Sequence, residues 1–250
     1  MVNCTIITVW NSQQMFQDLK DDLSRQQNVC YTLLDIDNRE NRYDGIRKAF
    51  NDCICKVQTE YVLFLHQDIQ FLHELSLHNF VSQLQDLGKF GVVGVAGCPK
   101  GPDWKILSNI LHGEEKAPAG EPVNSAAIIQ SVDECMFAMP AEVLRKIPFS
   151  TLGGWHLYAV EQCIRSEKLG LNNYVIAADV YHLSSGGSLD PSYITALLQL
   201  KDAYFIEDGL LNTTVKQWDL ATKKGLFYIR YYYWKQKCKR LCKSLGLLKG

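Results

Sequence analysis

The polar run His66-Gln67-Asp68 directly follows the apolar segment Tyr61–Leu65 (YVLFL). That segment predicts a buried β-strand, so the polar side chains lie where the chain leaves the core. In an extended chain, His66 and Asp68 project to the same side. An imidazole beside a carboxylate can bind a divalent cation or hydrogen-bond a phosphate-rich ligand. The same residues can also simply end a strand in water, and the pattern alone does not choose between these interpretations.

Polar residues also end the two preceding strands that the sequence predicts. The first strand, Cys4–Trp10 (CTIITVW), ends in Asn11, and the second, Tyr31–Ile36 (YTLLDI), runs into Asp37. Parallel sheets bind their ligands beyond the carboxyl ends of their strands. We therefore expect these strand ends to lie at one edge of a sheet, close to Asp68.

Predicted strands and helices alternate along the chain. Strands are predicted over residues 4–10, 31–36, 61–65, 91–96, 126–129, 131–138 and 174–178, and helices over residues 15–23, 46–57, 77–87, 155–169 and 192–206. This order predicts an α/β fold with a mostly parallel central sheet flanked by helices. We expect one domain over residues 1–220, in which residues 98–127 form a long loop over the ligand-binding face. A helical tail over residues 221–250 follows.

The composition is that of a globular protein, with 250 residues, 47% of them hydrophobic and 21% charged. This excludes a chain that is disordered or collagen-like throughout. The formal net charge of -1 conceals an asymmetry, because no Asp or Glu follows Asp219. The basic residues after Asp219 are Lys223, Lys224, Arg230, Lys235, Lys237, Lys239, Arg240, Lys243 and Lys249. An acidic body with a basic tail indicates two surfaces with different partners.

The tail interleaves its basic residues with aromatic ones. These are Phe227, Tyr228, Tyr231, Tyr232, Tyr233 and Trp234. Three arrangements fit this pattern: a helix lying on an anionic membrane surface, a helix packed on the domain or on a second subunit, and a helix binding nucleic acid. Because the acidic body would repel a nucleic acid, we expect no such partner, and peripheral membrane contact and a homo-oligomer stay open.

The sequence begins MVNCTIITVW, without the basic and long apolar regions of a secretory signal. No window of about 18 uninterrupted apolar residues predicts a membrane-spanning helix. The nine cysteines are scattered and odd in number, which favours reduced thiols. We therefore expect a cytoplasmic location, at the inner face of a membrane if the tail binds lipid. No glycine-rich fingerprint follows the first strand, which disfavours dinucleotide-binding and P-loop proteins.

The segment YVLFLHQDI resembles family-2-like glycosyltransferases of the GT-A fold. There, an Asp-x-Asp motif holds the metal of a nucleotide sugar, and one branch of the superfamily has His-Gln-Asp in its place. Matching segments follow in the same order, at residues 35–38, 49–51, 92–97, 132–138, 154–158, 163–165 and 181–187. The resemblance, over about residues 4–187, implies the GT-A fold and a metal-dependent, inverting glycosyltransferase. The implied donor is a nucleotide-diphosphate sugar, UDP-sugar by default, and the implied acceptor is a hydroxyl of a glycan or lipid-linked molecule, as in cell-surface glycan biosynthesis.

The resemblance also implies a metal site. Asp68 would bind the cation that neutralises the diphosphate, and His182 would complete the site. His66 would bind the same cation or contact a phosphate. A mixed oxygen and imidazole site suits Mn²⁺ better than Mg²⁺, which prefers oxygen ligands. His182 can also be a buried structural histidine that binds only backbone.

For the donor, the resemblance places Asn11, Asp35 and Asp37 near the nucleotide. Carboxylates suit this place because they accept hydrogen bonds from base N–H and ribose hydroxyl groups. Trp155 would stack on a sugar ring, or it is a core residue at the start of a helix. The residues from Ser184 to Ser188 are expected to form a loop that closes over the donor.

For the acceptor, the resemblance implicates Asp133-Glu134. Two adjacent carboxylates cannot both point inward from a strand, so we expect Asp133 to face the site and Glu134 to face solvent or a partner. The site also needs a general base to take the proton of the acceptor hydroxyl.

The identity of that base is open. Relatives carry an acidic residue near the start of the helix predicted over residues 155–169, where this chain has Tyr158 and Ala159. Glu161 and His156 are the nearest candidates, together with Asp133. The missing acid also leaves an alternative, in which the protein is catalytically inactive and binds a sugar nucleotide or a protein partner.

Overall fold

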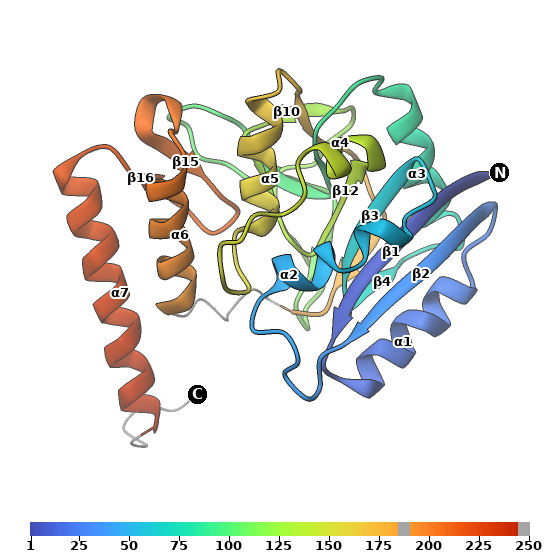
Figure 1. Cartoon of the computed structure of the whole chain (residues 1–250), viewed down its shortest axis with the longest axis horizontal. Coiled ribbons are helices and arrows are strands. Elements are labelled where there is room, and N and C mark those ends of the chain that lie inside the picture. The colour runs from blue at the N-terminus through green and yellow to red at the C-terminus, as the bar shows by residue number, and fades with distance from the viewer. Residues whose placement is uncertain (185–190, 245–250) are drawn as a thin grey trace.

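The computed structural model describes residues 1–184 and 191–244, and its centre is a seven-stranded sheet (Figure 1). Across the sheet, the strands are β10 (Ala127–Ile129), β13 (Asn173–Val175), β5 (Val93–Gly94), β12 (Met136–Pro140), β3 (Tyr61–His66), β1 (Val2–Trp10) and β2 (Val29–Asp37). Strands β10 and β12 run against the other five. The α/β class and the mostly parallel sheet are therefore confirmed.

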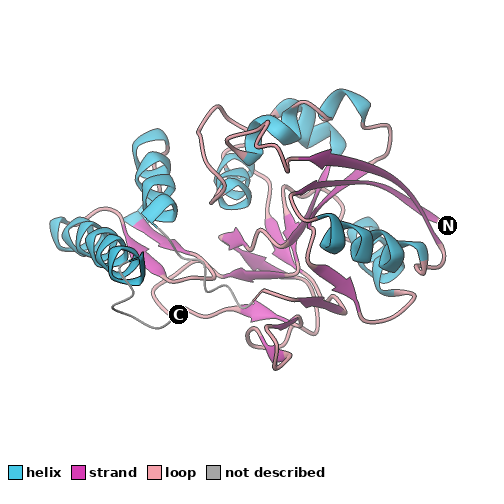
Figure 2. Cartoon of the chain, turned by 90° about the horizontal axis from the view of Figure 1, so that it is seen from below, coloured by secondary structure: helices cyan, strands magenta, loops and turns pink. Residues whose placement is uncertain are grey.

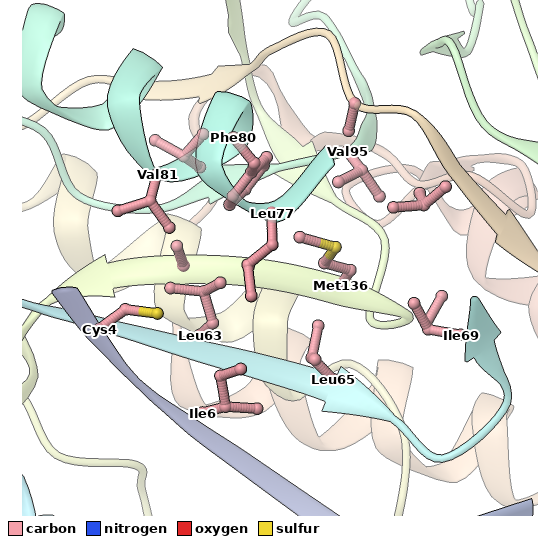
Figure 3. Packing of buried hydrophobic residues seen from close by; sticks show 14 of the residues in the cluster. Cys4, Ile6, Leu63, Leu65, Ile69, Leu77, Phe80, Val81, Val95 and Met136 are labelled. Atoms are coloured by element: carbon pink, nitrogen blue, oxygen red, sulfur yellow. The ribbon is translucent and has the colours of Figure 1, made fainter. Parts of the chain in front are cut away.

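One face of the sheet is covered by α1 (Gln13–Ser24) and α3 (Ser76–Asp86). Alternate residues of β1 and β3, such as Ile6 and Leu63, turn to this face because side chains alternate along a strand. They pack against Leu77 and Phe80 of α3 (Figure 3). Ser12 is the N-cap of helix α1, and its hydroxyl oxygen accepts a hydrogen bond from the N–H of Met15.

The intervening residues of the same strands face the other side. Ile7 and Phe64 pack there against α2 (Ile46–Asn51), α4 (Ala141–Lys146) and α5 (Tyr158–Glu167). Phe64 and Phe137 of β12 stack with ring centroids 4.7 Å apart. This three-layer arrangement fixes the carboxyl ends of β1 and β3 side by side.

A third cluster of buried residues lies at one end of the molecule (Figure 2). Helices α6 (Pro191–Ala203) and α7 (Lys223–Ser244) pack there with a hairpin of β15 (Leu210–Asn212) and β16 (Gln217–Asp219). Trp218 of the hairpin is 1% exposed. The predicted helical tail is thus present as α7, and part of it packs on the domain.

Two smaller sheets and two 3₁₀-turns complete the described chain. The first sheet contains β11 (Ser131–Val132), β6 (Ala96–Cys98) and β7 (Leu107–Ser108). The second contains β4 (Ile69–Phe71), β14 (Val180–His182), β8 (Leu111–His112) and β9 (Ala117–Pro118). The turns are η1 (Ile54–Lys56) and η2 (Glu207–Gly209). The long segment predicted as a loop therefore contains short strands. No helix among the described residues is long and apolar enough to span a bilayer.

Several predicted elements differ from the structure. The helix predicted over residues 46–57 ends at Asn51 and is followed by the 3₁₀-turn η1. The strand over residues 91–96 breaks into β5 and β6, where a Cβ on Gly94 would lie 2.6 Å from Val132, so only glycine fits this crossing. The strand over residues 131–138 breaks into β11 and β12, which belong to different sheets. Helix α5 begins at Tyr158, because Leu157 has a left-handed φ of 59°.

Candidate active site

His66, Asp68 and His182 meet at the tip of β3. Antiparallel pairing of β14 with β4 sets His182 opposite Ile69, and the N–H of Leu183 donates to the carbonyl of Asp68 at 3.1 Å. The three side chains each offer one ligand atom, and these atoms all lie within 4.8 Å of one another. Residues more than 110 positions apart in the chain therefore form one cluster.

The cluster fits a divalent cation. Nε2 of His182 is buried 3.4 Å from Oδ1 of Asp68 and makes no well-aligned hydrogen bond to any residue that the structure describes. Nδ1 of His66 lies 4.0 Å from the same oxygen, while its Nε2 is 2.9 Å from the hydroxyl of Tyr158. A bond on the far nitrogen orients an imidazole toward a metal. Two imidazoles and a carboxylate suit a transition-metal ion better than Mg²⁺, which prefers oxygen ligands.

Burial and the charges of neighbouring residues shift the pKa values of these three side chains. Burial and the neighbouring His182 lower the pKa of His66, so this ring is neutral at neutral pH and can be a ligand. Burial disfavours the charge of Asp68, but His182 outweighs it and holds the pKa of this carboxyl below its usual value. Burial also opposes protonation of His182, yet Asp68 raises the pKa of that imidazole.

Two cavities meet at this cluster. We name them the β1 cavity, of about 440 Å³, and the β12 cavity, of about 500 Å³. Trp10, Asn11, Asn38 and Asn41 are among the residues that line the β1 cavity, and Asp133, Glu134, His156, Tyr193 and Thr214 are among those that line the β12 cavity. His66, Asp68 and Trp155 line both. One molecule in each cavity would meet the other beside the cluster.

A model of a glycosyltransferase-like family matches residues 4–183 of the chain. The chain belongs to this glycosyltransferase-like family. The predicted family is therefore confirmed.

Two solved structures share the fold of this glycosyltransferase-like protein. S. aureus TarS 1–349 in complex with UDP has a TM-score of 0.52 and 14% identity, over 80% of this chain and 64% of that one. GalNAc-T7 with UDP, GalNAc and Mn²⁺ has a TM-score of 0.53 and 8% identity, over 82% of this chain and 48% of that one. Both likenesses concern the fold, and they support the predicted GT-A architecture. The chain spans less than two thirds of either structure.

A curated relative is the "ATP synthase subunits region ORF 6" of Fuscovulum blasticum. It is 26% identical over an alignment of 157 residues, and the match covers 58% of this chain and 60% of the relative. The match spans about three fifths of that relative's length.

Glu161, predicted as a candidate base, lies in the interior of this glycosyltransferase-like protein. Its Oε2 is 2.5 Å from Nε of Arg47, and both side chains are at most 2% exposed. Its Oε1 accepts the hydroxyl of Tyr204 at 2.6 Å. Since both oxygens are occupied and Glu161 lines neither cavity, the geometry contradicts Glu161 as the base.

Arg47 gives this buried pair a structural role. Its guanidinium also donates to the carbonyls of Gly153 at 3.4 Å and His156 at 3.2 Å. The same segment lies against the start of α2, where the N–H of Ile46 donates to the carbonyl of Gly154. The Arg47–Glu161 pair therefore holds the loop that carries Trp155 between the two cavities.

Glu161→Gln should lower the free energy of unfolding by about 3 kcal/mol, because it leaves the charge of Arg47 buried without a counter-charge. Urea denaturation measures this. Glu167→Gln on the exposed side of the same helix should change it little, since Glu167 is 56% exposed in its pair with Lys100. Unchanged stability together with lost sugar transfer would restore Glu161 as the base.

Asp133 and Glu134 both line the β12 cavity. The expectation that only one could face the site is wrong, because the two residues lie in the bend between β11 and β12, where strand alternation does not apply. Burial opposes the charge of Asp133, but hydrogen bonds from the Thr214 hydroxyl (2.6 Å) and the Cys135 N–H (3.0 Å) lower the pKa of this carboxyl. Asp133 is thus a weak base with both oxygens engaged.

Glu134, which the sequence analysis expected to face solvent or a partner, is the carboxylate whose place in the site was missed. Its Oε1 accepts the N–H of Tyr158, at the start of α5, at 2.7 Å. Loss of water around the carboxyl and the charge of Asp133 raise the pKa of Glu134 to about 8. The carboxylate therefore lies at the helix start where the family resemblance implies an acidic residue. The sequence does show the pair Asp133-Glu134, but the break between β11 and β12, which lets both residues line the cavity, was not anticipated.

The predicted donor residues have mixed outcomes. Asn11 lines the β1 cavity. The side-chain amide of Gln67 accepts the backbone N–H of Asn11 and donates to the side-chain oxygen of Asn11. Asp35 accepts the indole N–H of Trp10, and Asp37 pairs with Arg39 at 2.6 Å. Neither carboxylate lines the cavity, whereas Asn38 and Asn41, which the prediction left out, do.

Two further predictions have simple outcomes. Trp155 is 38% exposed on the wall of both cavities, so it is not a core residue. Of the predicted donor-closing loop, Ser184 lines the β12 cavity. The remainder, residues 185–188, lies outside the described residues.

Proposed function

We propose that this protein transfers a sugar from a nucleotide-diphosphate donor to a hydroxyl acceptor, with inversion and with a divalent cation. The observation that carries the proposal is the His66–Asp68–His182 cluster, in which His66 and Asp68 line both cavities and His182 lines the β12 cavity. The donor would lie in the β1 cavity, and the acceptor in the β12 cavity. Family membership supports the reaction class.

The cation would be held by Asp68 and His182, with His66 as a third ligand. When bound, it would neutralise the negative charge that develops on the leaving diphosphate. The two imidazoles favour Mn²⁺ over Mg²⁺. Tyr158 would keep His66 turned toward the cation through the 2.9 Å contact with Nε2.

The donor is proposed to be a UDP-sugar, since TarS and GalNAc-T7, which share the fold, are solved with UDP. Asn11, Asn38 and Asn41 line the β1 cavity and present amide groups that can hydrogen-bond a base or ribose. Trp155, on the shared wall, would lie against the transferred sugar. Neither Asp35 nor Asp37 lines the cavity, so both would act through Trp10. Asp35 accepts the indole N–H of Trp10, and Asp37 holds Arg39, whose guanidinium lies 4.7 Å from the Trp10 ring.

Glu134 is proposed as the general base. Its carboxylate would take the proton of the acceptor hydroxyl while that oxygen bonds to the anomeric carbon and the bond to the diphosphate breaks. A carboxyl with a pKa raised to about 8 holds a proton better than an ordinary glutamate and is thus a stronger base. His156 lines the same cavity with its ring 5.7 Å from that of Tyr193, and it is the alternative base.

The acceptor is proposed to be a glycan or a lipid-linked molecule, and the location to be cytoplasmic. The second candidate function is a protein that binds a sugar nucleotide without turnover. It is favoured by Tyr158 and Ala159, which stand at the helix start where the family resemblance implies an acidic residue. Turnover with any donor and acceptor would exclude it.

Isothermal titration calorimetry with UDP, GDP and their sugars tests the donor site. We expect a uridine nucleotide to bind, and Mn²⁺ to tighten that binding at least about tenfold, because cation and diphosphate stabilise each other. Equal nucleotide affinity with and without Mn²⁺ would argue against the metal site. Absence of binding by every nucleotide would overturn both candidate functions.

A further inference from the structure

Helix α7 has two apolar faces, and within residues 1–184 and 191–244 the buried cluster covers only one of them. Ile229, Tyr232 and Tyr233 fall at helical spacing and belong to the third buried cluster. Ile229 is 1% exposed, and the ring centroid of Tyr232 lies 5.7 Å from that of Trp218. This inner face fixes α7 along the outside of α6, at the end of the molecule (Figures 1 and 2).

The opposite side of α7 carries a second apolar row, which we name the outer stripe. It consists of Phe227, Tyr231, Trp234 and Leu241, which are 73%, 55%, 63% and 59% exposed. At 100° per residue, these side chains fall within about 80° of one another, and the row from Phe227 to Leu241 is about 21 Å long. Large apolar side chains gathered in this way mark an interaction surface rather than an ordinary exterior.

Basic residues border the outer stripe on both sides. By helical position, Lys224 and Lys235 lie on one border, and Arg230 and Lys237 lie on the other; all four are exposed. Nζ of Lys237 lies 5.6 Å from the ring of Trp234, so the cation and the aromatic row form one surface. No acidic residue occurs after Asp219, so α7 has no negative charge of its own.

We propose that the outer stripe lies in the interface of an anionic lipid bilayer. Aromatic side chains favour the headgroup level of a membrane, and flanking cations favour anionic lipids. The charge pattern selects this occupant: two copies stacked stripe to stripe would bring their cationic borders together, and a nucleic acid would meet the acidic body. The inner face remains on the domain, so α7 binds the surface without crossing it.

Sedimentation of the full chain with vesicles tests this proposal. Vesicles of phosphatidylcholine with 30% phosphatidylserine should bind it at least about tenfold more tightly than pure phosphatidylcholine, and raising the salt should weaken the binding. The double variant Phe227→Ser/Trp234→Ser should lose at least about tenfold in affinity for the anionic vesicles. The charge variant Lys235→Glu/Lys237→Glu should lose as much or more.

Matched variants on the body control for general effects. Ile128→Ser removes an apolar side chain that is 60% exposed on β10, and Lys89→Glu/Lys146→Glu reverses two exposed lysines outside α7. Both should bind anionic vesicles as the unchanged chain does. The α7 variants should retain their melting temperature and their nucleotide binding, so that failure here is separate from failure of the proposed activity.

Three outcomes would overturn the proposal. Equal binding to both kinds of vesicle would show that the outer stripe does not select anionic lipids. No binding to either would show that it does not bind a bilayer. A dimer in analytical ultracentrifugation that the Phe227→Ser/Trp234→Ser change dissociates, without vesicle binding, would assign the stripe to a second copy of this chain.

Discussion

Asp68→Asn should lower the rate of donor turnover by about 10²–10³-fold, measured as UDP released from the UDP-sugar that binds in calorimetry. The amide keeps the shape of the side chain but removes the charge that faces His182 at 3.4 Å and His66 at 4.0 Å. A cation held by two neutral imidazoles alone would bind less tightly. The diphosphate would then leave with less charge neutralisation.

The same change should weaken Mn²⁺ binding in the presence of UDP. Asp21→Asn is the matched control, because Asp21 is an exposed carboxylate on α1 that hydrogen-bonds only locally with Gln17. His182→Ala should also lower turnover, and the double variant with Asp68→Asn should lose much less than the product of the single losses, because residues that act as a unit are not additive. Full turnover by Asp68→Asn with Mn²⁺ would refute the metal site.

The sequence was informative about this cluster because strand ends are visible in a single chain. A run such as YVLFL followed by His66-Gln67-Asp68 predicts a strand that ends in polar groups, and β3 is present over Tyr61–His66. The place of His182 in the cluster could not be predicted from strand ends, because His182 reaches Asp68 only through the pairing of β14 with β4. Spacing alone does not predict that contact, and the family resemblance supplied it.

Glu161 marks a limit of the same reasoning. Its neighbours in sequence predict a helix, and α5 is there, but its partner Arg47 lies 114 residues away. Helical periodicity predicts on which side of a helix a residue lies, but it does not predict which charged residue will lie opposite. The residue expected to be the catalytic base is therefore half of a buried ion pair that supports the loop before α5.

The donor side shows a related limit. The end of β2 was predicted to within one residue, but which of Asp35, Asp37 and Asn38 faces the cavity depends on local partners. Trp10 binds Asp35, Arg39 binds Asp37, and the side chain of Asn38 bonds the backbone of Tyr43. Such short-range competition is decided by side-chain geometry, which a strand pattern does not contain.

Glu134→Gln should lower turnover by about 10²–10⁴-fold, the usual contribution of a general base. The glutamine oxygen can still accept the N–H of Tyr158, which Glu134 accepts at 2.7 Å, so the start of α5 should keep its shape. A base works in its deprotonated form, and the pKa of Glu134 is raised to about 8. The rate of the unchanged protein should therefore rise with pH, with a midpoint at or below about 8, since a nearby cation lowers the pKa of a carboxyl.

In Glu134→Gln this rise with pH should disappear, while the melting temperature and the affinity for UDP with Mn²⁺ stay as they were. Glu142→Gln is the matched control, because Glu142 is an exposed residue in the first turn of α4. If Glu134→Gln keeps the rise and His156→Ala removes it, the base is His156. A glutamine variant with full activity at every pH would leave Glu134 with only its structural contact to α5, and the carboxylate that replaces the missing helix acid would have to be sought elsewhere.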